Sequence, residues 1–264
     1  MLQEYKPKRS ENLLKHEGDV AFSRDYYYKH KPNNLYFLLR KRYLWMNKYI
    51  KKNDKVLEVG CGIGVSKDFI RKDCRILLTD FDKHPWVDKN VDALNTKFPK
   101  NQFDVVFCSN MIHHLSFPKK FFLEMARILK PNGYLLIQEV NCSIMTKIIL
   151  KILKHEGWKN DVDVYSLDKE CNDSKDPWSS NNAIPNLLFD DINNFKKEIP
   201  YFKIKEQKFS ELFIFALSGG VTAKAKTINL PFFILKFIDN FDNFLAFIAP
   251  NFFAMQRRIV LRKR

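Results

Sequence analysis

The fold of this 264-residue chain is decided by the stretch Val56-Leu57-Glu58-Val59-Gly60-Cys61-Gly62-Ile63-Gly64-Val65. The first four residues are apolar except for Glu58, which is typical of a strand buried on both faces of a parallel sheet. Glycine at positions 60, 62 and 64 removes the Cβ atoms where the backbone must turn sharply and approach a ligand. We expect a helix from Ser66 to Arg71 to follow, with its N-terminal N–H groups facing the turn. The stretch therefore predicts a binding site, with a small anion as its natural occupant.

The spacing of the glycines separates two kinds of ligand. A dinucleotide-binding turn follows G-x-G-x-x-G/A, which would place a small residue at position 65. That position holds Val65, and the third glycine comes one residue early. The pattern E-x-G-x-G-x-G resembles motif I of the class I S-adenosylmethionine-dependent methyltransferases. The resemblance implies that the turn holds the methionine end of S-adenosylmethionine, with these residues as cofactor contacts: Glu58, Gly60, Cys61, Gly62 and Gly64.

An acidic residue ends the next predicted strand, Arg75 to Asp80. Asp80 lies 16 residues after Gly64, close to the position where a doubly wound fold places the carboxylate that binds a ribose. A solvated turn residue is the alternative interpretation, and Asp82 is the fallback carboxylate. The resemblance adds Phe81 to the cofactor contacts and also implies an adenine site. There Asp92 accepts a hydrogen bond from the exocyclic amine, and Ala93 supplies a backbone N–H.

A second family-like block begins with the strand predicted from Phe103 to Asn110, a run of β-branched and aromatic residues. It continues as F-D-V-V-F-x-x-x-x-x-H-H-L, and the resemblance implies that Asn110 and Met111 line the methionine side of the cofactor. His113 and His114 are candidate general bases, because imidazole titrates near neutrality. Neighbouring residues on a helix point about 100° apart, so we expect at most one of them to face the site. A packing or helix-start role for the pair is the alternative.

A third block, L-K-P-N-G-Y-L-L-I-Q-E, joins a predicted amphipathic helix to a predicted strand. The helix is expected from Lys119 to Leu129, and it should stop at Lys130-Pro131-Asn132-Gly133. The strand is expected from Tyr134 to Glu139. Glu139 ends it at the ligand edge, so we count it as a candidate catalytic residue, with a structural carboxylate as the alternative.

The flanking segments predict a covering layer around this core. Helices are expected from Asn33 to Ile50 and from Ser143 to Trp158, and Tyr26-Tyr27-Tyr28 is a candidate lid. The turn-rich segment Asp176 to Pro185 resembles a subgroup of bacterial surface-polysaccharide methyltransferases. Its Trp178 is a candidate for stacking on a sugar, and a buried anchor is the alternative.

The last third of the chain predicts two closing strands, Phe209 to Leu217 and Arg258 to Arg262, with an apolar insertion from Leu230 to Pro250 between them. The apolar pieces of the insertion are too short and too charged to span a bilayer. Peripheral membrane contact through residues 230–264, assisted by the basic end of the chain, is one interpretation. Helices that cover the sheet, or a dimer face, are the others.

Composition sets further limits on the protein. The formal charge is +15, but Lys and Arg are spread along the chain and no nucleic-acid module is recognisable, so a nucleic-acid partner is not expected. The five cysteines lack metal-ligand spacing, which predicts a reducing compartment and no metal site. The absence of an apolar N-terminal segment and of a long apolar run predicts a cytoplasmic protein, with membrane contact at most peripheral.

Together these patterns predict an α/β, Rossmann-like, doubly wound sheet, mostly parallel with an antiparallel seventh strand. We divide the chain into an N-terminal helical cap (1–54), a cofactor-binding core (55–142) and an acceptor region (143–264), the last with helical insertions after strands five and six. The resemblance implies O-methylation of a small-molecule or carbohydrate acceptor, for example a lipid-linked surface polysaccharide. RNA ribose methylation and a non-catalytic, cofactor-binding accessory subunit remain alternatives. Val65 disfavours a nicotinamide oxidoreductase.

Overall fold

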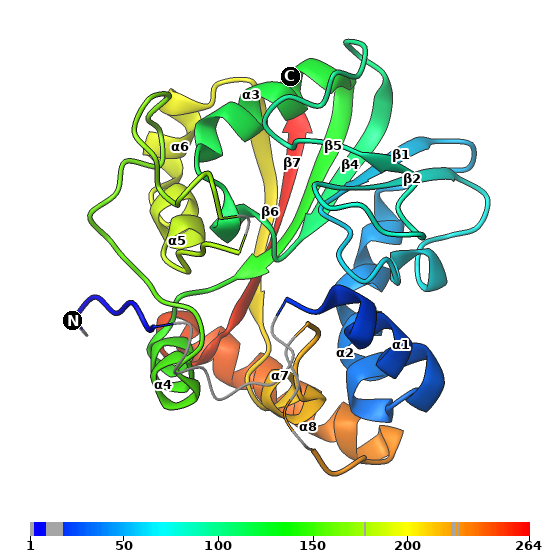
Figure 1. Ribbon diagram of the computed structural model, residues 1–264, viewed down its shortest axis with the longest axis vertical. Coiled ribbons are helices and arrows are strands. Elements are labelled where there is room, and N and C mark those ends of the chain that lie inside the picture. The colour runs from blue at the N-terminus through cyan, green and yellow to red at the C-terminus, as the bar shows by residue number, and fades with distance from the viewer. Residues whose placement is uncertain (1–2, 9–17, 177, 223–224, 226) are drawn as a thin grey trace.

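The computed structural model describes residues 3–8, 18–176, 178–222, 225 and 227–264 (Figure 1). These residues form a seven-stranded sheet with the order β3-β2-β1-β4-β5-β7-β6. The strands β3, β2, β1, β4 and β5 run parallel, whereas β7 is antiparallel to both β5 and β6. The predicted fold class is confirmed, including the antiparallel seventh strand.

The strands of the sheet are β1 (Lys55–Val59), β2 (Arg75–Asp80), β3 (Lys89–Asn90), β4 (Phe103–Ser109), β5 (Leu129–Val140), β6 (Phe202–Ser210) and β7 (Gln256–Lys263). The α-helices of the described residues are α1 (Val20–His30), α2 (Asn33–Leu44), α3 (Pro118–Ile128), α4 (Ile144–Leu153), α5 (Ile184–Phe189), α6 (Ile192–Glu198), α7 (Phe213–Ser218), α8 (Phe232–Ile248) and α9 (Pro250–Phe253). The described residues also form the short 3₁₀ turns η2 (Trp45–Lys48), η3 (Ser66–Asp68) and η4 (Ile112–His114).

Both faces of the sheet are buried, which explains the continuous apolar run in β1. Leu57 and Val59 belong to a hydrophobic core under α3, α5 and α6. Val56 points the other way, into a second core under α2. Since a strand alternates its side chains between faces, a strand with helices on both sides needs apolar residues at nearly every position.

The prediction of a helix from Ser66 to Arg71 is wrong, because only the short 3₁₀ turn η3 forms there. The side chain of Asn47 takes the backbone groups that a longer helix would have used. Its Nδ2 donates to the Phe69 carbonyl at 2.9 Å, and its Oδ1 accepts from the Arg71 N–H at 2.9 Å. Phe69 is buried under α2, so the N-terminal helix covers this face in place of a crossover helix. The dipole argument for an anion at a helix N-terminus therefore does not apply.

The strand predicted from Phe209 to Leu217 is also wrong. The strand β6 ends at Ser210, and the apolar residues that follow form α7. The carboxylate of Asp242 in α8 fixes this change, because it accepts the N–H groups of Leu212, Phe213 and Ile214 at 2.9–3.0 Å and so begins the helix. The true strand is charged and alternating because it lies at the sheet edge with only part of it buried.

Other boundaries moved by several residues. The helix α2 ends at Leu44 and continues only as η2. The helix α4 stops at Leu153, because Lys154 adopts the left-handed conformation with φ of 47°. The strand β5 begins at Leu129, so the predicted stop signal at residues 130–133 lies inside the strand.

A layer of three helices, α2, α7 and α8, lies together at the lower end of the molecule in Figure 1. The insertion predicted between the last two strands is thus helical. Within the described residues, no helix combines the length and the apolar character that crossing a bilayer requires.

Candidate active site

A cavity of about 980 Å³ opens where the parallel strands β1, β2 and β4 end. Ligands of open α/β folds bind at this edge of the sheet. Its lining joins residues of the glycine turn to residues of α4, α7 and the segment after β4. The predicted site residues that line it are Gly60, Cys61, Gly62, Asp80, Phe81, Asp92, Ala93, Asn110, Met111, His113 and His114. Three predicted site residues, Glu58, Gly64 and Glu139, are not part of the lining.

The three glycines of the turn have different surroundings. All have positive φ angles, of 71°, 50° and 63°, which explains why glycine occupies these positions. A Cβ at Gly60 would lie 2.6 Å from Cγ of Met111, and one at Gly64 would lie 2.4 Å from the ring of Trp86. A Cβ at Gly62 would meet no atom within 4 Å. Because Gly62 also lines the cavity, the bare backbone there leaves space that fits a bound cofactor.

The carboxylate of Asp80 supports the glycine turn from below. One oxygen accepts the N–H of Gly62 at 2.8 Å, and the other accepts the N–H of Asp82 at 3.2 Å. Burial raises the pKa of Asp80. Asp80 also lines the cavity, so it remains in position to accept hydrogen bonds from a ribose.

Glu58 lies beneath the turn, fully buried. One of its oxygens accepts the hydroxyl hydrogen bond of Ser66, and the other is buried with no partner in the described residues. Burial raises its pKa to about 8. Glu58 is therefore placed to brace the turn rather than to touch a ligand in the cavity.

Asp92 and Ala93, the residues predicted for an adenine site, lie on the loop after β3. Asp92 and Ala93 both line the cavity, and Phe81 exposes 64% of its surface beside them. One oxygen of Asp92 accepts the N–H of Leu94 at 2.8 Å, which fixes the loop.

The helix α1 and Trp86 pack over the glycine turn from outside. Arg24 Nη1 donates to the Ile63 carbonyl at 2.5 Å, and Trp86 Nε1 donates to the Gly62 carbonyl at 2.8 Å. The guanidinium of Arg24 lies 4.7 Å from the centre of the Trp86 ring. The predicted tyrosine lid does not line the cavity, and the hydroxyl of Tyr28 instead donates to Asp68.

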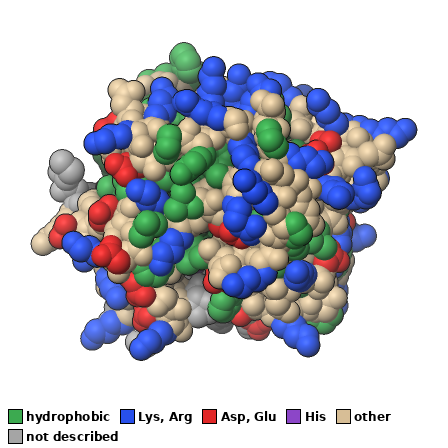
Figure 2. Space-filling view, turned by 90° about the horizontal axis from the view of Figure 1, so that it is seen from above, with side chains coloured by type: hydrophobic (Ala, Val, Ile, Leu, Met, Phe, Trp, Pro, Cys, Tyr) green, Lys and Arg blue, Asp and Glu red, His purple; other side chains and the backbone are tan. Residues whose placement is uncertain are grey.

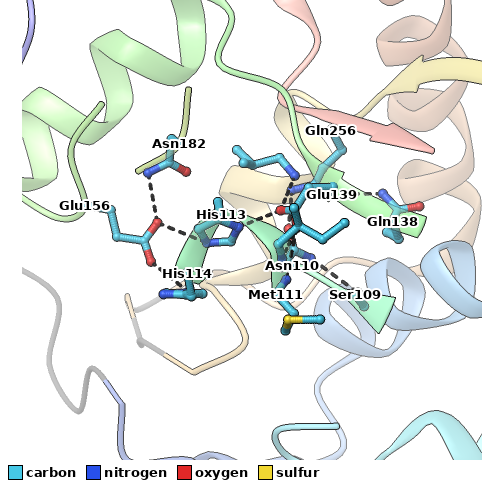
Figure 3. Close-up of polar contacts among 12 residues, drawn as sticks. Ser109, Asn110, Met111, His113, His114, Gln138, Glu139, Glu156, Asn182 and Gln256 are labelled. Carbon is cyan, nitrogen blue, oxygen red and sulfur yellow. Dashed lines mark hydrogen bonds and ion pairs between the residues drawn. The ribbon is translucent and has the colours of Figure 1, made fainter. Parts of the chain in front are cut away.

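Glu139 is fully buried and acts on the cavity through its neighbours (Figure 3). Its Oε2 accepts the N–H groups of Met111 at 3.0 Å and Ile112 at 2.7 Å, and its Oε1 lies 2.6 Å from His113 Nδ1. Burial opposes the negative charge of Glu139, but His113 outweighs it and lowers the pKa. Glu139 is thus a positioning residue that orients one histidine and the segment after β4.

Both histidines line the cavity, so the expectation that only one would face it is wrong. They lie in a single 3₁₀ turn with ring centres 4.1 Å apart, and both rings turn toward Glu156 (Figure 3). Nε2 of His113 is 3.6 Å and Nε2 of His114 is 3.7 Å from the two oxygens of Glu156. Burial opposes the charge on His113, but Glu139 and Glu156 outweigh it and raise its pKa to about 10. Burial and the charge of His113 lower the pKa of His114 to about 4.

The sequence did not indicate Glu156. It lies just after α4, within a segment expected to be one uninterrupted helix, and it reaches the histidines only through the tertiary fold. Asn182 Nδ2 donates to its Oε2 at 3.1 Å. Trp178 lines the same part of the cavity with its ring centre 6.1 Å from that of His114. Pro177, in the same predicted loop, lies outside the described residues.

Comparison with known proteins agrees with the fold. Residues 28–182, more than half of the chain, match the family described as "Methyltransferase domain", and the chain belongs to this family. The family match confirms that the predicted class, a methyltransferase, is correct, and the observed sheet agrees with it.

Two curated relatives and one solved structure illustrate the likeness. An uncharacterized protein of Methanocaldococcus jannaschii is 33% identical over 103 residues, which are 37% of this chain and 45% of that protein. A ubiquinone biosynthesis O-methyltransferase of Proteus mirabilis is 27% identical over 103 residues, 33% of this chain and 42% of the relative. The crystal structure of a SAM-dependent methyltransferase from Archaeoglobus fulgidus matches with a TM-score of 0.53 at 17% identity, over 86% of this chain and 93% of that one. The aligned regions thus span less than half of the two curated relatives, and the match to the solved structure supports the fold alone.

Proposed function

We propose that this protein transfers a methyl group from S-adenosylmethionine to a hydroxyl of an acceptor that combines a polar head with an apolar part, such as a lipid-linked glycan. One observation carries the proposal: a single cavity joins the open backbone at Gly62 to the cluster of His113, His114 and Glu156. A cofactor on the glycine turn and an acceptor beside the histidines would therefore meet inside the same cavity.

The two ends of the cavity would have different roles: the glycine turn would bind the cofactor, and the histidine cluster would bind the methyl acceptor. When bound, S-adenosylmethionine supplies an electrophilic methyl carbon. Asp80 and Asp92 would accept hydrogen bonds from its ribose and adenine, and Gly60 and Gly62 would let the backbone approach it. The main contribution of the protein would be positioning, which is worth on the order of 7–11 kcal/mol when reacting atoms are held in contact.

The histidine cluster would hold the acceptor hydroxyl. Because Glu139 and Glu156 keep His113 charged, His113 is poorly suited to accept a proton. His114 is neutral, and its Nε2 faces the cavity side of Glu156. We propose that the cluster of His114 and Glu156 binds the hydroxyl group of the methyl acceptor and promotes the loss of its proton, with Glu139 as a positioning residue.

The wall of the cavity supports an acceptor with an apolar part. α4 contributes Ile149, Ile152 and Leu153, and α7 contributes Phe215. Trp178 offers an aromatic face next to His114, which suits a sugar ring. The relative named for ubiquinone biosynthesis favours a second candidate, an aromatic hydroxyl acceptor. Competition between glycolipids and hydroquinones for the same enzyme would separate the two.

We propose that the protein meets its acceptor at a membrane surface, through α8. This helix exposes a row of apolar side chains: Phe233 (75%), Phe237 (74%), Phe244 (57%), Phe247 (87%) and Ile248 (59%). Aromatic side chains on one face of a helix are favourable at the boundary between headgroups and acyl chains. Figure 2 shows the opposite end of the molecule, where Lys and Arg are dispersed among other side chains rather than gathered in one stripe. The face in this view therefore lacks the continuous basic stripe that is typical of a nucleic-acid-binding surface.

A vesicle experiment tests the membrane contact. The double variant Phe237→Ser, Phe247→Ser should lose sedimentation with vesicles that contain anionic lipid, whereas Ile192→Ser, a matched loss of a half-exposed apolar side chain on α6, should not. Equal sedimentation of all three proteins would contradict the proposal.

A transfer experiment tests the activity. Labelled methyl groups from S-adenosylmethionine should appear in the lipid-extractable fraction of a cell extract, and Gly62→Ala should weaken the signal at a low concentration of the cofactor. Cofactor binding without any transfer would favour the accessory-subunit alternative, and label in RNA would favour ribose methylation.

We propose the same division of the chain as the sequence predicts: residues 1–54 form a cap, residues 55–142 the cofactor-binding core and residues 143–264 the acceptor region. We also propose that the protein is cytoplasmic and acts at the inner face of the membrane.

A further inference from the structure

Three potential metal ligands converge at the acceptor end of the cavity. They are the imidazoles of His113 and His114 and the carboxylate of Glu156, and one ligand atom of each lies within 4.8 Å of the others. Figure 3 shows both rings directed at the carboxylate from the segment after β4, with Glu156 facing them from the segment after α4. Two imidazoles and one carboxylate form a recurring ligand set for divalent transition-metal ions.

The far nitrogen of each ring is already occupied. His113 Nδ1 lies 2.6 Å from Glu139 Oε1, and His114 Nδ1 lies 3.1 Å from the carbonyl oxygen of Ser179. Both partners are acceptors, so each Nδ1 carries a hydrogen and donates it. Nε2 is therefore the ring atom left for a ligand in each histidine, and a metal ion bound there would displace the proton that His113 carries at this nitrogen. Metal-binding histidines usually donate their other nitrogen to a carboxylate or a backbone carbonyl in this way.

The separations between the three groups fit a shared ion better than direct hydrogen bonds. The Nε2 atoms are 3.6 and 3.7 Å from the oxygens of Glu156, beyond the usual range of an N–H···O hydrogen bond. Around a tetrahedral Zn²⁺ with bonds of about 2.1 Å, neighbouring ligand atoms are separated by roughly 3.4 Å. Small rotations of the side chains would therefore bring all three groups into contact with one ion.

The cluster is also held in place and open on one side. Asn182 Nδ2 donates to Glu156 Oε2 at 3.1 Å and fixes the carboxylate. His114 and Glu156 keep 19% and 18% of their side-chain surface exposed, and both line the cavity. Three protein ligands with an accessible side are typical of catalytic zinc sites, in which water or substrate completes the coordination.

We propose that His113, His114 and Glu156 bind a divalent transition-metal ion of the Zn²⁺ type, and that this ion binds the acceptor hydroxyl. The inference rests on the proposed function for the identity of the substrate group, and it departs from the expectation that the chain has no metal site. A hydroxyl bound to such an ion releases its proton to solvent water near neutral pH, because the positive charge stabilises the oxyanion. The imidazole ligands favour Zn²⁺ or Co²⁺ over Mg²⁺ and Ca²⁺.

The test measures metal binding without reference to activity. The full-length chain is freed of metal with a chelator, dialysed, and titrated with CoCl₂ and with ZnCl₂. Visible absorption reports the coordination of Co²⁺, and elemental analysis reports Zn²⁺ per chain. We expect one equivalent of either ion, and at least about 100-fold weaker binding for His114→Asn and for Glu156→Gln. The control His30→Asn removes a histidine from the exposed end of α1 and should bind like the wild type.

The outcomes separate this inference from the proposed function. Binding of S-adenosylhomocysteine serves as the folding control for each variant, because the glycine turn is intact in all of them. Less than about 0.1 equivalent of metal on a wild-type chain that binds S-adenosylhomocysteine would overturn the metal site, as would equal metal affinity of all variants. Stoichiometric metal that both variants lose supports the site even if no methyl transfer is found, a result that would count against the proposed function alone.

Discussion

Gly62→Ala tests the steric basis of cofactor binding most directly. Gly62 is the one glycine of the turn whose added Cβ would meet no protein atom within 4 Å, so the methyl group would occupy the cavity and not the core. The residue has φ of 50°, and an alanine in this left-handed region costs about 1–2 kcal/mol of folding free energy. The melting temperature should therefore fall by about 2–8 °C, while the fold remains.

The affinity for the cofactor should fall more than this strain alone explains. A methyl group forced into a close-packed contact typically costs about 1–3 kcal/mol, which corresponds to a dissociation constant raised roughly 5- to 150-fold. Isothermal titration calorimetry with S-adenosylhomocysteine measures this change. Asn132→Ala is the control, because Asn132 also has a positive φ, of 64°, but lies on the exposed bend in β5. A folded Gly62→Ala protein with wild-type affinity would refute the reasoning. Gly60→Ala is less informative, since its Cβ would collide with Met111 whether or not the cofactor is bound.

Three further substitutions test other parts of the structure. Asp80→Asn keeps a hydrogen-bond acceptor for the glycine turn but removes the negative charge. The dissociation constant for S-adenosylhomocysteine, measured by titration calorimetry, should therefore rise roughly 5- to 30-fold, and Asp82→Asn should raise it less. If Asp82→Asn has the larger effect, Asp82 and not Asp80 is the ribose carboxylate. Asp242→Ala leaves the N–H groups of residues 212–214 without their hydrogen-bond acceptor. The free energy of unfolding, measured by urea titration, should therefore fall by about 3 kcal/mol or more. An unchanged urea concentration at the unfolding midpoint would contradict this prediction. Glu58 has its pKa raised by burial from 4.5 to about 8, so the wild type loses stability as the pH rises through this window. Glu58→Gln should therefore match the wild type at pH 4 and exceed it by roughly 3–5 kcal/mol at pH 8, and parallel stability curves would contradict the assigned burial.

The local sequence was sufficient to predict those elements whose structure follows from the pattern of apolar residues and glycines within one segment. The strands β1, β2 and β4 are apolar runs that end at turn residues, and helices on both faces of the sheet require that pattern. The glycine turn follows from its spacing, because positive φ angles at three alternate residues are costly for other side chains. The cavity lining from the turn and the strand ends followed from the same logic, since the parallel strands end at one edge.

The rest depended on side chains that lie far apart in the sequence. Residues 66–71 fail to form a helix because Asn47 binds their backbone, and residues 213–218 form one because Asp242 does. The local pattern contains neither partner. The expected positions of Glu58 and Glu139 at the ligand also changed, because burial beneath the turn and hydrogen bonding to backbone N–H groups hold both carboxylates away from the cavity.

The sequence by itself determined the class of this protein, a methyltransferase built on a parallel sheet with a bare glycine turn at one edge. Only the tertiary structure decided what faces that turn across the cavity. Glu156 joins His113 and His114 because α4 ends at Lys154 and returns the chain to the end of β4. Hydrogen bonds and periodicity within a segment act over a few residues and can be read along the chain. The meeting of charged groups from separate segments depends on packing, which appears only when the whole chain is folded.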